Sequence, residues 1–176
     1  MTVFQFAYGN GSKQFTLHED NVQSILFPRS VEVQSTGTDE VRRALAEPIS
    51  SARLRNLVHK GQKVVLVTSD LTRPMPSRQV VPLVLAELTA GGVLLKDLTI
   101  VFAIGSHRPH TEAEMRSLVG DDVFESVLCL DSNPLDCVSL GQTSSGTPVD
   151  IFRCVAEADF QICLGNIEFH WFAGYS

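Results

Sequence analysis

Side chains able to do chemistry gather in three short segments of this chain, and each segment follows an apolar stretch. The segments read SDLTRP at 69–74, GSHRPHT at 105–111 and NIEFHWFAGYS at 166–176. They contain the carboxylate of Asp70, the guanidinium groups of Arg73 and Arg108, and the imidazoles of His107 and His170. Because histidine titrates near neutral pH, two imidazoles beside one substrate carbon could act as general acid and base on opposite sides of it. The guanidinium of Arg73 could hold a substrate carboxylate through two hydrogen bonds.

Structural roles compete with these catalytic ones. Asp70 and Thr72 could form only an Asx turn that leaves a strand. Arg73 and Arg108 could be solvated, or could form structural ion pairs. A single histidine after a strand is more often a loop residue than a catalyst. We expect His110 to cap or orient the helix that follows it rather than to react.

The catalytic roles require elements that bring the segments to one edge of a sheet. KVVLVTS at 63–69 and LTIVFAI at 98–104 are almost continuously apolar, which is typical of strands buried on both faces of a parallel sheet. Ser77–Ala90, between them, has apolar residues in helical register. A strand, a crossover helix and a second strand are parallel in nearly all proteins. We therefore expect 70–73 and 105–107 to be neighbours at the carboxyl ends of the strands, where α/β sheets bind ligands.

The rest of the chain predicts an α/β fold, with a parallel or mixed sheet flanked by helices and an N-terminal β-hairpin. The hairpin turns at Gly9-Asn10-Gly11. Thr111 and Glu114 match a capping box, and Pro82 predicts a kink or a late start in its helix. The other predicted strands are 2–8, 13–17, 21–27, 127–130, 138–142, 147–152 and 160–164, and the other predicted helical segments are 39–46, 52–60, 112–120 and 153–158.

Composition indicates one cytoplasmic globular domain. Of 176 residues, 44% are apolar and 19% are charged. The net charge is −6 and there is no run of Lys or Arg, which argues against nucleic acid and anionic membranes as partners and favours a small molecule. Neither a membrane span nor a signal peptide is evident. The four cysteines are never spaced CxxC, so we expect buried free thiols. No GxxxxGK[ST] or GxGxxG loop supports a nucleotide hydrolase.

Taken together, the three segments resemble motifs of the nickel-dependent lactate racemase family. SDLTRP, GSHRPHT with Glu112 and Glu114 beside it, and EFHWFAGYS occur in the family's order at fitting spacings, and YGNGSKQFTL looks like the family's opening segment. The resemblance implies an isomerase that interconverts the enantiomers of a 2-hydroxy acid. It also implies a nickel-pincer nucleotide cofactor, nickel pyridinium-3,5-bisthiocarboxylate mononucleotide. In that family a histidine removes the hydroxyl proton while the C2 hydride passes to the cofactor and returns on either face.

The resemblance assigns roles to individual residues. His107 and His170 fall on the two catalytic histidines, and Arg73 falls on the arginine that binds the substrate carboxylate. The implied cofactor-binding residues are Asp70, Leu71, Thr72, Arg73, Gly174, Tyr175 and Ser176. The family's covalently bound lysine and its nickel ligand would follow Ser176, so no residue of 1–176 is a candidate metal ligand.

The resemblance further implies that 1–176 is the N-terminal, cofactor-binding domain of a two-domain enzyme, truncated at its C-terminus. We expect this chain alone neither to retain nickel tightly nor to racemise a substrate. Phe169 stands where family members more often have proline. The alternative is a truncated or degenerate homologue that binds a nucleotide or small carboxylate without turnover. Lactate is only the default substrate, and the sequence does not determine the oligomeric state.

Overall fold

The computed structural model describes residues 1–27, 29–170 and 174–175 of the chain. The chain divides into two compact units, Met1–Gln34 and Ser35–Ser176. The candidate site lies entirely in the second unit.

The first unit is built on the predicted hairpin, which is confirmed. Strand β1 (Thr2–Tyr8) pairs antiparallel with β2 (Gly11–Leu17), with Tyr8 opposite Gly11. Gly9 provides the positive φ, +56°, that the tight turn requires. The ring of Phe15 stacks on Phe4 and Phe6 at centroid distances of 5.4 and 5.3 Å.

The predicted strand at 21–27 is wrong. The chain forms a 3-10 helix, η1 (Glu19–Asn21), and no strand follows it among the described residues up to 27. Ile25, Leu26 and Phe27 are exposed, so the apolar run that suggested a strand is not buried. A strand requires backbone hydrogen bonds to a neighbouring strand, and an apolar run by itself does not provide that neighbour.

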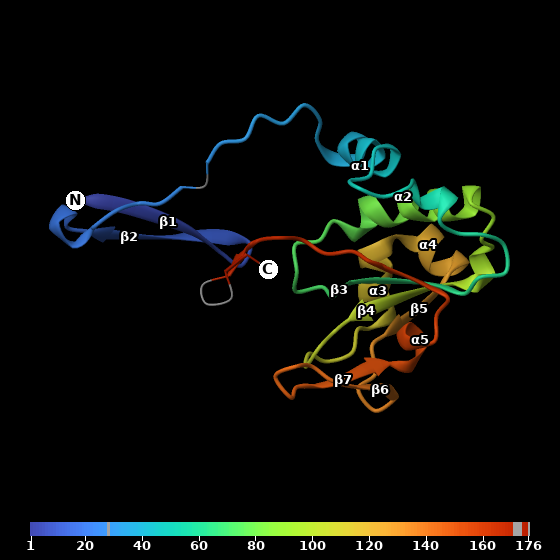
Figure 1. Ribbon diagram of the computed structural model, residues 1–176. Helices are drawn as coiled ribbons and strands as arrows, with labels where there is room; N and C mark the ends of the chain where they lie inside the picture. Colours follow the sequence, from blue (N-terminus) through green and yellow to red (C-terminus); the bar gives the residue numbers. More distant parts are fainter. Residues whose placement is uncertain (28, 171–173, 176) are drawn as a thin grey trace. The chain divides into compact units, whose positions relative to one another are not determined.

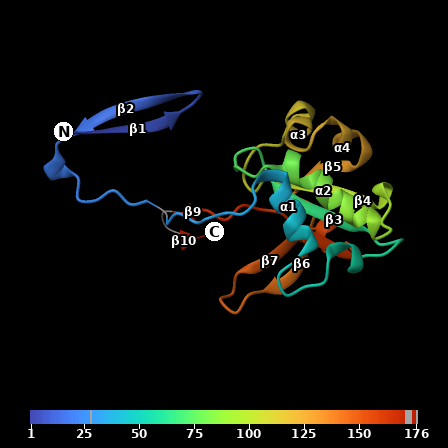
Figure 2. The same cartoon turned by 90° about the horizontal axis from the view of Figure 1, so that it is seen from above.

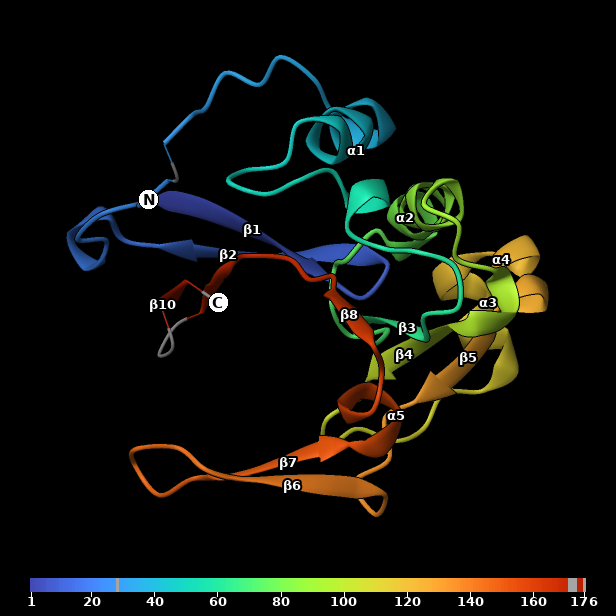
Figure 3. The ribbon, with the colours of Figure 1, turned by 45° about the vertical axis from the view of Figure 1, so that its right-hand side comes forward.

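The second unit contains a four-stranded parallel sheet in the order β5-β4-β3-β8. The strands are β3 (Val64–Ser69), β4 (Leu98–Ala103), β5 (Leu128–Asp131) and β8 (Phe160–Cys163). Figure 3 shows them side by side. Ser69 is in register with Ala103, so β3 and β4 end at the same level. We call this side of the sheet, where the strands end, the carboxyl edge.

Helices cover one face of this sheet (Figure 1). They are α1 (Gly37–Ala46), α2 (Ser77–Ala90), α3 (Glu112–Val119) and α4 (Asp121–Ser126). Figure 2 shows α1 alongside α2. On the opposite side lie α5 (Arg153–Ala156) and an antiparallel ribbon of β6 (Cys137–Gln142) and β7 (Pro148–Phe152).

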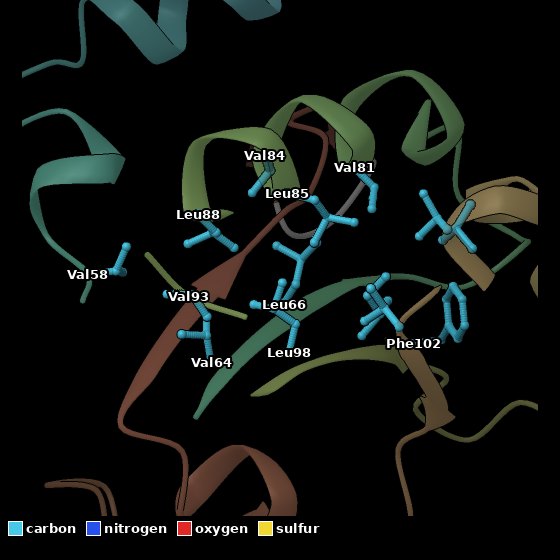
Figure 4. Close-up of a cluster of buried hydrophobic side chains, with 14 of the residues drawn as sticks. Val58, Val64, Leu66, Val81, Val84, Leu85, Leu88, Val93, Leu98 and Phe102 are labelled. Atoms are coloured by element: carbon cyan, nitrogen blue, oxygen red, sulfur yellow. The ribbon is translucent and has the colours of Figure 1, made fainter. Parts of the chain in front are cut away.

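The core lies between α2 and the sheet. Val81 and Leu88 of α2 are fully buried and point toward Leu66 of β3 and Leu98 of β4 (Figure 4). Each fully buried aliphatic side chain contributes about 1.5–3 kcal/mol of transfer free energy. The predicted bounds of α2 are confirmed, with Pro82 inside the helix. This packing fixes the two strands whose ends carry the candidate site.

The predicted helix at 52–60 is wrong, because only a 3-10 turn, η2 (Leu54–Asn56), forms there. Side-chain contacts to α2 decide this conformation. The Nη2 atoms of Arg53 and Arg55 lie 2.7 and 2.5 Å from Oε1 of Glu87, a group we call the Glu87 clamp. Hydrogen bonds from the two guanidiniums lower the pKa of Glu87 to about 2 against the opposing effect of its burial.

Smaller differences concern elements that the sequence pattern did not show. Helix α4 and the short strands β9 (Phe169–His170) and β10 (Gly174–Tyr175) were not predicted. Helix α1 begins at Gly37, with Thr36 as its N-cap, two residues before the predicted start at 39. All four cysteines are free as expected, but Cys163 is exposed and the others are only partly buried. No helix in the described part of the chain is long and apolar enough to cross a bilayer.

Candidate active site

Two loops meet at the carboxyl edge, as predicted from the parallel arrangement of β3 and β4. The first is the turn of residues 70–73 after β3, and the second is the loop 105–110 after β4. Gly105 has a φ of +56°, which favours glycine, and the chain then turns so that the His107 amide donates to the Ile104 carbonyl oxygen at 2.9 Å. A cavity of about 280 Å³ lies between the loops, and Asp70, Arg73, Ser106 and His107 contribute to its lining.

Asp70 and His107 form a close pair in this cavity. Nδ1 of His107 lies 2.5 Å from Oδ2 of Asp70, whose residue is 4% exposed, whereas the His107 side chain is 48% exposed. Burial raises the pKa of the Asp70 carboxyl, but hydrogen bonds from Thr72 and His107 outweigh burial and hold that pKa below its ordinary value. An ionised carboxylate can only accept, so Nδ1 of His107 carries the shared proton. In the neutral form of the His107 ring, Nε2 is then the acceptor nitrogen.

The second oxygen of Asp70 organises the turn itself. Oδ1 accepts hydrogen bonds from the backbone N–H of Thr72 at 3.2 Å and from its hydroxyl at 2.7 Å. The Asx turn that the sequence offered as a purely structural role is therefore present. It does not exclude the pairing with His107, because each role uses a different oxygen of the same carboxylate.

The two arginines of these segments have different environments. Arg108 donates to both carboxylate oxygens of Glu114, at 2.6 and 2.9 Å, and so acts as a structural ion-pair residue. Arg73 is exposed, lines the cavity with Asp70 and His107, and has no carboxylate within 4.0 Å among the described residues. Its guanidinium is therefore available to an anionic ligand.

His110 has a different place from the one its sequence position suggested. Thr111 caps α3, because its hydroxyl accepts from the Glu114 amide at 3.3 Å and the Glu114 side chain accepts from the Thr111 amide at 2.8 Å. The predicted capping box is thus confirmed. The imidazole of His110 instead bridges the amide of Leu71 and the carboxylate of Asp131, at 3.2 and 2.6 Å.

Sequence reasoning missed the contribution of β5. Asp131 ends this strand, and the hydroxyl of Ser132 accepts from the Ile104 amide at 3.2 Å. A second cavity, of about 500 Å³, lies between the 105–109 loop and residues 131–134, and His107 also borders this cavity. The available signal was a polar Asp-Ser pair directly after an apolar stretch at 127–130, the same pattern that identified the other segments.

Three of the remaining predicted site residues, His170, Gly174 and Tyr175, lie in a short antiparallel ribbon. His170 of β9 stands opposite Gly174 of β10, and Phe169 stands opposite Tyr175. The ribbon therefore brings one predicted catalytic residue next to two predicted cofactor-binding residues. Ser176 lies outside the described residues. That His170 shares one cleft with His107 stays a prediction.

Comparisons with known proteins agree with the motifs at this edge. Lactate racemase from Thermoanaerobacterium thermosaccharolyticum is 34% identical over 181 residues, which cover 100% of this chain and 42% of that protein. Lactate racemase from Lactiplantibacillus plantarum is 35% identical over 141 residues, or 78% of this chain and 33% of that protein. The structure of the lactate racemase apoprotein from the first organism superposes with a TM-score of 0.79 at 33% identity, over 99% of this chain and 41% of that one.

The chain thus spans about two fifths of the length of the first of these relatives. A profile of the lactate racemase N-terminal domain matches residues 8–176, which include all three segments. On this match, and on the pairing of its SDLTRP and GSHRPHT loops, the chain belongs to the lactate racemase N-terminal domain family.

Proposed function

We propose that this chain supplies the acid/base and cofactor-binding part of a racemase or epimerase that acts on 2-hydroxy acids, with lactate as the default substrate. The observation that carries the proposal is the Asp70–His107 pair beside the exposed guanidinium of Arg73 in one cavity. A 2-hydroxy acid needs two contacts from this arrangement, one for its carboxylate and one for its hydroxyl proton.

The residues of the carboxyl edge can provide both contacts. Arg73 would bind the substrate carboxylate bidentately. Nε2 of His107 would then accept the proton of the 2-hydroxyl group as general base, and Asp70 would stabilise the imidazolium that forms. His170 would perform the same step on the opposite face of the substrate, so that either enantiomer can lose or regain its proton.

We place the nickel-pincer nucleotide implied by the family at the carboxyl edge because two cavities meet there. The cavities of about 280 and 500 Å³ that meet at His107 are comparable to sites for small ligands and cofactors. The 70–73 turn and the 174–175 segment would hold the nucleotide. Among the described residues, no group of three or more His, Cys, Asp or Glu side chains could hold a metal ion. The chemistry the bound group would supply is acceptance and return of the hydride at C2.

An isotope experiment tests the proposal directly. Full-length protein loaded with the cofactor is incubated with L-lactate carrying deuterium at C2, and both the enantiomeric composition and the label are followed. We expect racemisation with the deuterium retained in the product. Replacement of the label by solvent hydrogen would refute hydride return, and binding of lactate without any racemisation would indicate a binding protein.

Histidine variants test the assignment of the acid/base groups. His107→Asn and His170→Asn should each lower kcat by about 10²–10⁴-fold while lactate still binds, because a positioned acid or base contributes a factor of that size. His59→Asn is the matched control, since His59 is exposed and its Nδ1 lies 3.2 Å from the neighbouring Lys60 carbonyl oxygen, away from both loops. Full activity in either test variant would remove that histidine from the mechanism.

A further inference from the structure

We infer that His110 is a positioning residue: a neutral imidazole, protonated on Nδ1, that ties the 70–73 turn to the end of β5 and so holds Asp70 opposite His107. The inference assigns a role to a buried group that the proposed reaction does not use. Its functional consequence rests on the proposed function, whereas its structural part can be tested without it.

The hydrogen bonds of His110 determine its tautomer. A backbone amide can only donate, so Nε2, which lies 3.2 Å from the Leu71 nitrogen, must be an unprotonated acceptor. Nδ1 therefore carries the proton and donates it to Oδ1 of Asp131 at 2.6 Å. Oδ2 of Asp131 accepts from the backbone amide of His110 itself at 2.7 Å, which fixes the carboxylate relative to the ring. A second ring proton, on Nε2, would point at the Leu71 N–H and abolish the hydrogen bond between them.

Burial explains why this ring positions other groups and does not react. The His110 side chain is 1% exposed, and the ring of Phe102 packs against it in a T-shaped arrangement with a centroid distance of 5.4 Å. A neutral imidazole has one donor and one acceptor, and both are used within the protein. The ring therefore has neither a free nitrogen nor access to a substrate, in contrast to the half-exposed ring of His107.

The hydrogen bond between His110 and the Leu71 amide acts on Asp70 through the backbone. The amide that His110 accepts from belongs to Leu71, the residue directly after Asp70, so the peptide plane between them is held. Among the described residues, two side-chain bonds join the 70–73 turn to the loop after β4: Asp70 to His107, and Leu71 to His110. One attachment alone would let the turn rotate about it. Two hydrogen bonds, from adjacent residues of the turn to residues 107 and 110 of the loop, fix its orientation.

Nitrogen NMR on the 176-residue chain, labelled with ¹⁵N in histidine and in the backbone, tests the tautomer and the contact. At neutral pH we expect an unprotonated Nε2, a protonated Nδ1 and a scalar coupling across the hydrogen bond between His110 Nε2 and the Leu71 nitrogen. A protonated Nε2, or a doubly protonated ring, would overturn the assignment. This result does not depend on any catalytic activity, so it separates failure of the inference from failure of the proposed function.

Two substitutions test the positioning role in the full-length, cofactor-loaded protein. His110→Phe fills the space but removes both hydrogen bonds, whereas His110→Gln retains an amide oxygen that can accept from Leu71. We expect kcat to fall about 10–100-fold in His110→Phe, because a displacement near 1 Å at the reacting groups can cost a factor of that order, and to recover in large part in His110→Gln.

Two readouts distinguish positioning from mere packing. Carboxyl ¹³C titration of the 176-residue chain should show the pKa of Asp70 higher in His110→Phe than in the wild type, because the displaced turn weakens the donors that lower it. Thermal unfolding of both variants reports any general loss of stability. Equal kcat in His110→Phe and wild type, or a lowered melting temperature with an unchanged Asp70 titration, would overturn the positioning role.

Discussion

Replacement of Asp70 by asparagine is the most direct test of the acid/base role proposed for the Asp70–His107 pair. Asn has the shape of Asp but presents one oxygen and one NH₂ group. Oδ1 of residue 70 accepts two hydrogen bonds from Thr72, at 3.2 and 2.7 Å, so the amide oxygen is expected to occupy that position. The NH₂ group would then face Nδ1 of His107, where the wild type has an acceptor at 2.5 Å. Because NH₂ only donates, Nδ1 must become the acceptor and the ring proton must move to Nε2.

The tautomer change should act on catalysis and leave substrate binding almost intact. With a proton on Nε2, His107 cannot accept the hydroxyl proton, so we expect kcat to fall by the contribution of a general base, about 10²–10⁴-fold. KM should change little, because Arg73 is untouched. The free energy of unfolding should fall by about 1 kcal/mol, which is less than the roughly 1.5–3 kcal/mol typical of hydrogen bonds to charged groups, because the His107 ring is half exposed.

The pH dependence of stability provides a second measurement on the same variant. The pKa of Asp70 is lowered in the folded state from an ordinary value of 3.8, so its ionised form stabilises the fold above about pH 4. This contribution disappears as pH falls through the lowered pKa. Urea unfolding should therefore show a difference between wild type and Asp70→Asn at pH 7 that shrinks as the pH falls below about 4.

The assay is racemisation by the full-length, cofactor-loaded protein, with Thr72→Val as the matched control. Thr72→Val removes only the hydroxyl donor to Oδ1 and leaves the His107 contact in place. It should retain most of kcat. An Asp70→Asn variant with wild-type kcat, or one in which only KM changes, would refute the assignment of the base to Nε2 of His107.

Three further predictions concern the elements that hold the site. Glu87→Gln should lower the free energy of unfolding by about 1–2 kcal/mol at pH 7, a modest value because the arginine side chains of the Glu87 clamp are 36% and 39% exposed. In urea unfolding, the difference from wild type should shrink as the pH falls from about 4.5 to about 2, because residue 87 of the unfolded wild type takes up its proton before that of the folded protein does. Thr111→Ala should cost about 1 kcal/mol through loss of the cap of α3, measured by thermal unfolding against Ser51→Ala, an exposed serine outside the helices. Gly105→Ala should lower the free energy of unfolding by about 1 kcal/mol or more because φ is +56° there, although an added Cβ would meet no atom within 4 Å. Gly165 is equally open but has no positive φ, so Gly165→Ala should leave stability unchanged. Equal stability of the two variants would contradict the backbone explanation.

Local sequence patterns were sufficient where each residue's neighbours in the chain decide its conformation. The hairpin turn at Gly9-Asn10, the helix Ser77–Ala90 and the capping box of Thr111 follow from turn chemistry, helical periodicity and side-chain caps. Local patterns failed at 52–60, where a helix was predicted but the arginines bind Glu87, which is 27 residues beyond the end of this segment. They also failed at 21–27, where an apolar run alone does not supply a pairing partner.

The sequence likewise predicted some features of the candidate site and not others. The residue types and the rule that parallel strands end at one edge were enough to place Asp70, Arg73 and His107 together, and the family motifs pointed to the same residues. The sequence could not distinguish Arg73 from Arg108, because the free or paired state of a guanidinium depends on which carboxylate the fold brings to it. Nor could it find the role of Asp131, which is 21 residues from its partner His110.

The sequence by itself therefore determined which strands end in polar residues, that β3 and β4 are parallel, and which chemical groups are offered to a ligand. These features follow from periodicity and turn chemistry, which are properties of short stretches of chain. Only the tertiary structure decided which nitrogen of each imidazole carries a proton. That choice depends on a carboxylate or an amide delivered from a distant segment, to His107 by Asp70 and to His110 by Leu71 and Asp131. Proton position is set by the partner at hydrogen-bond distance, and that partner exists only once the chain has folded.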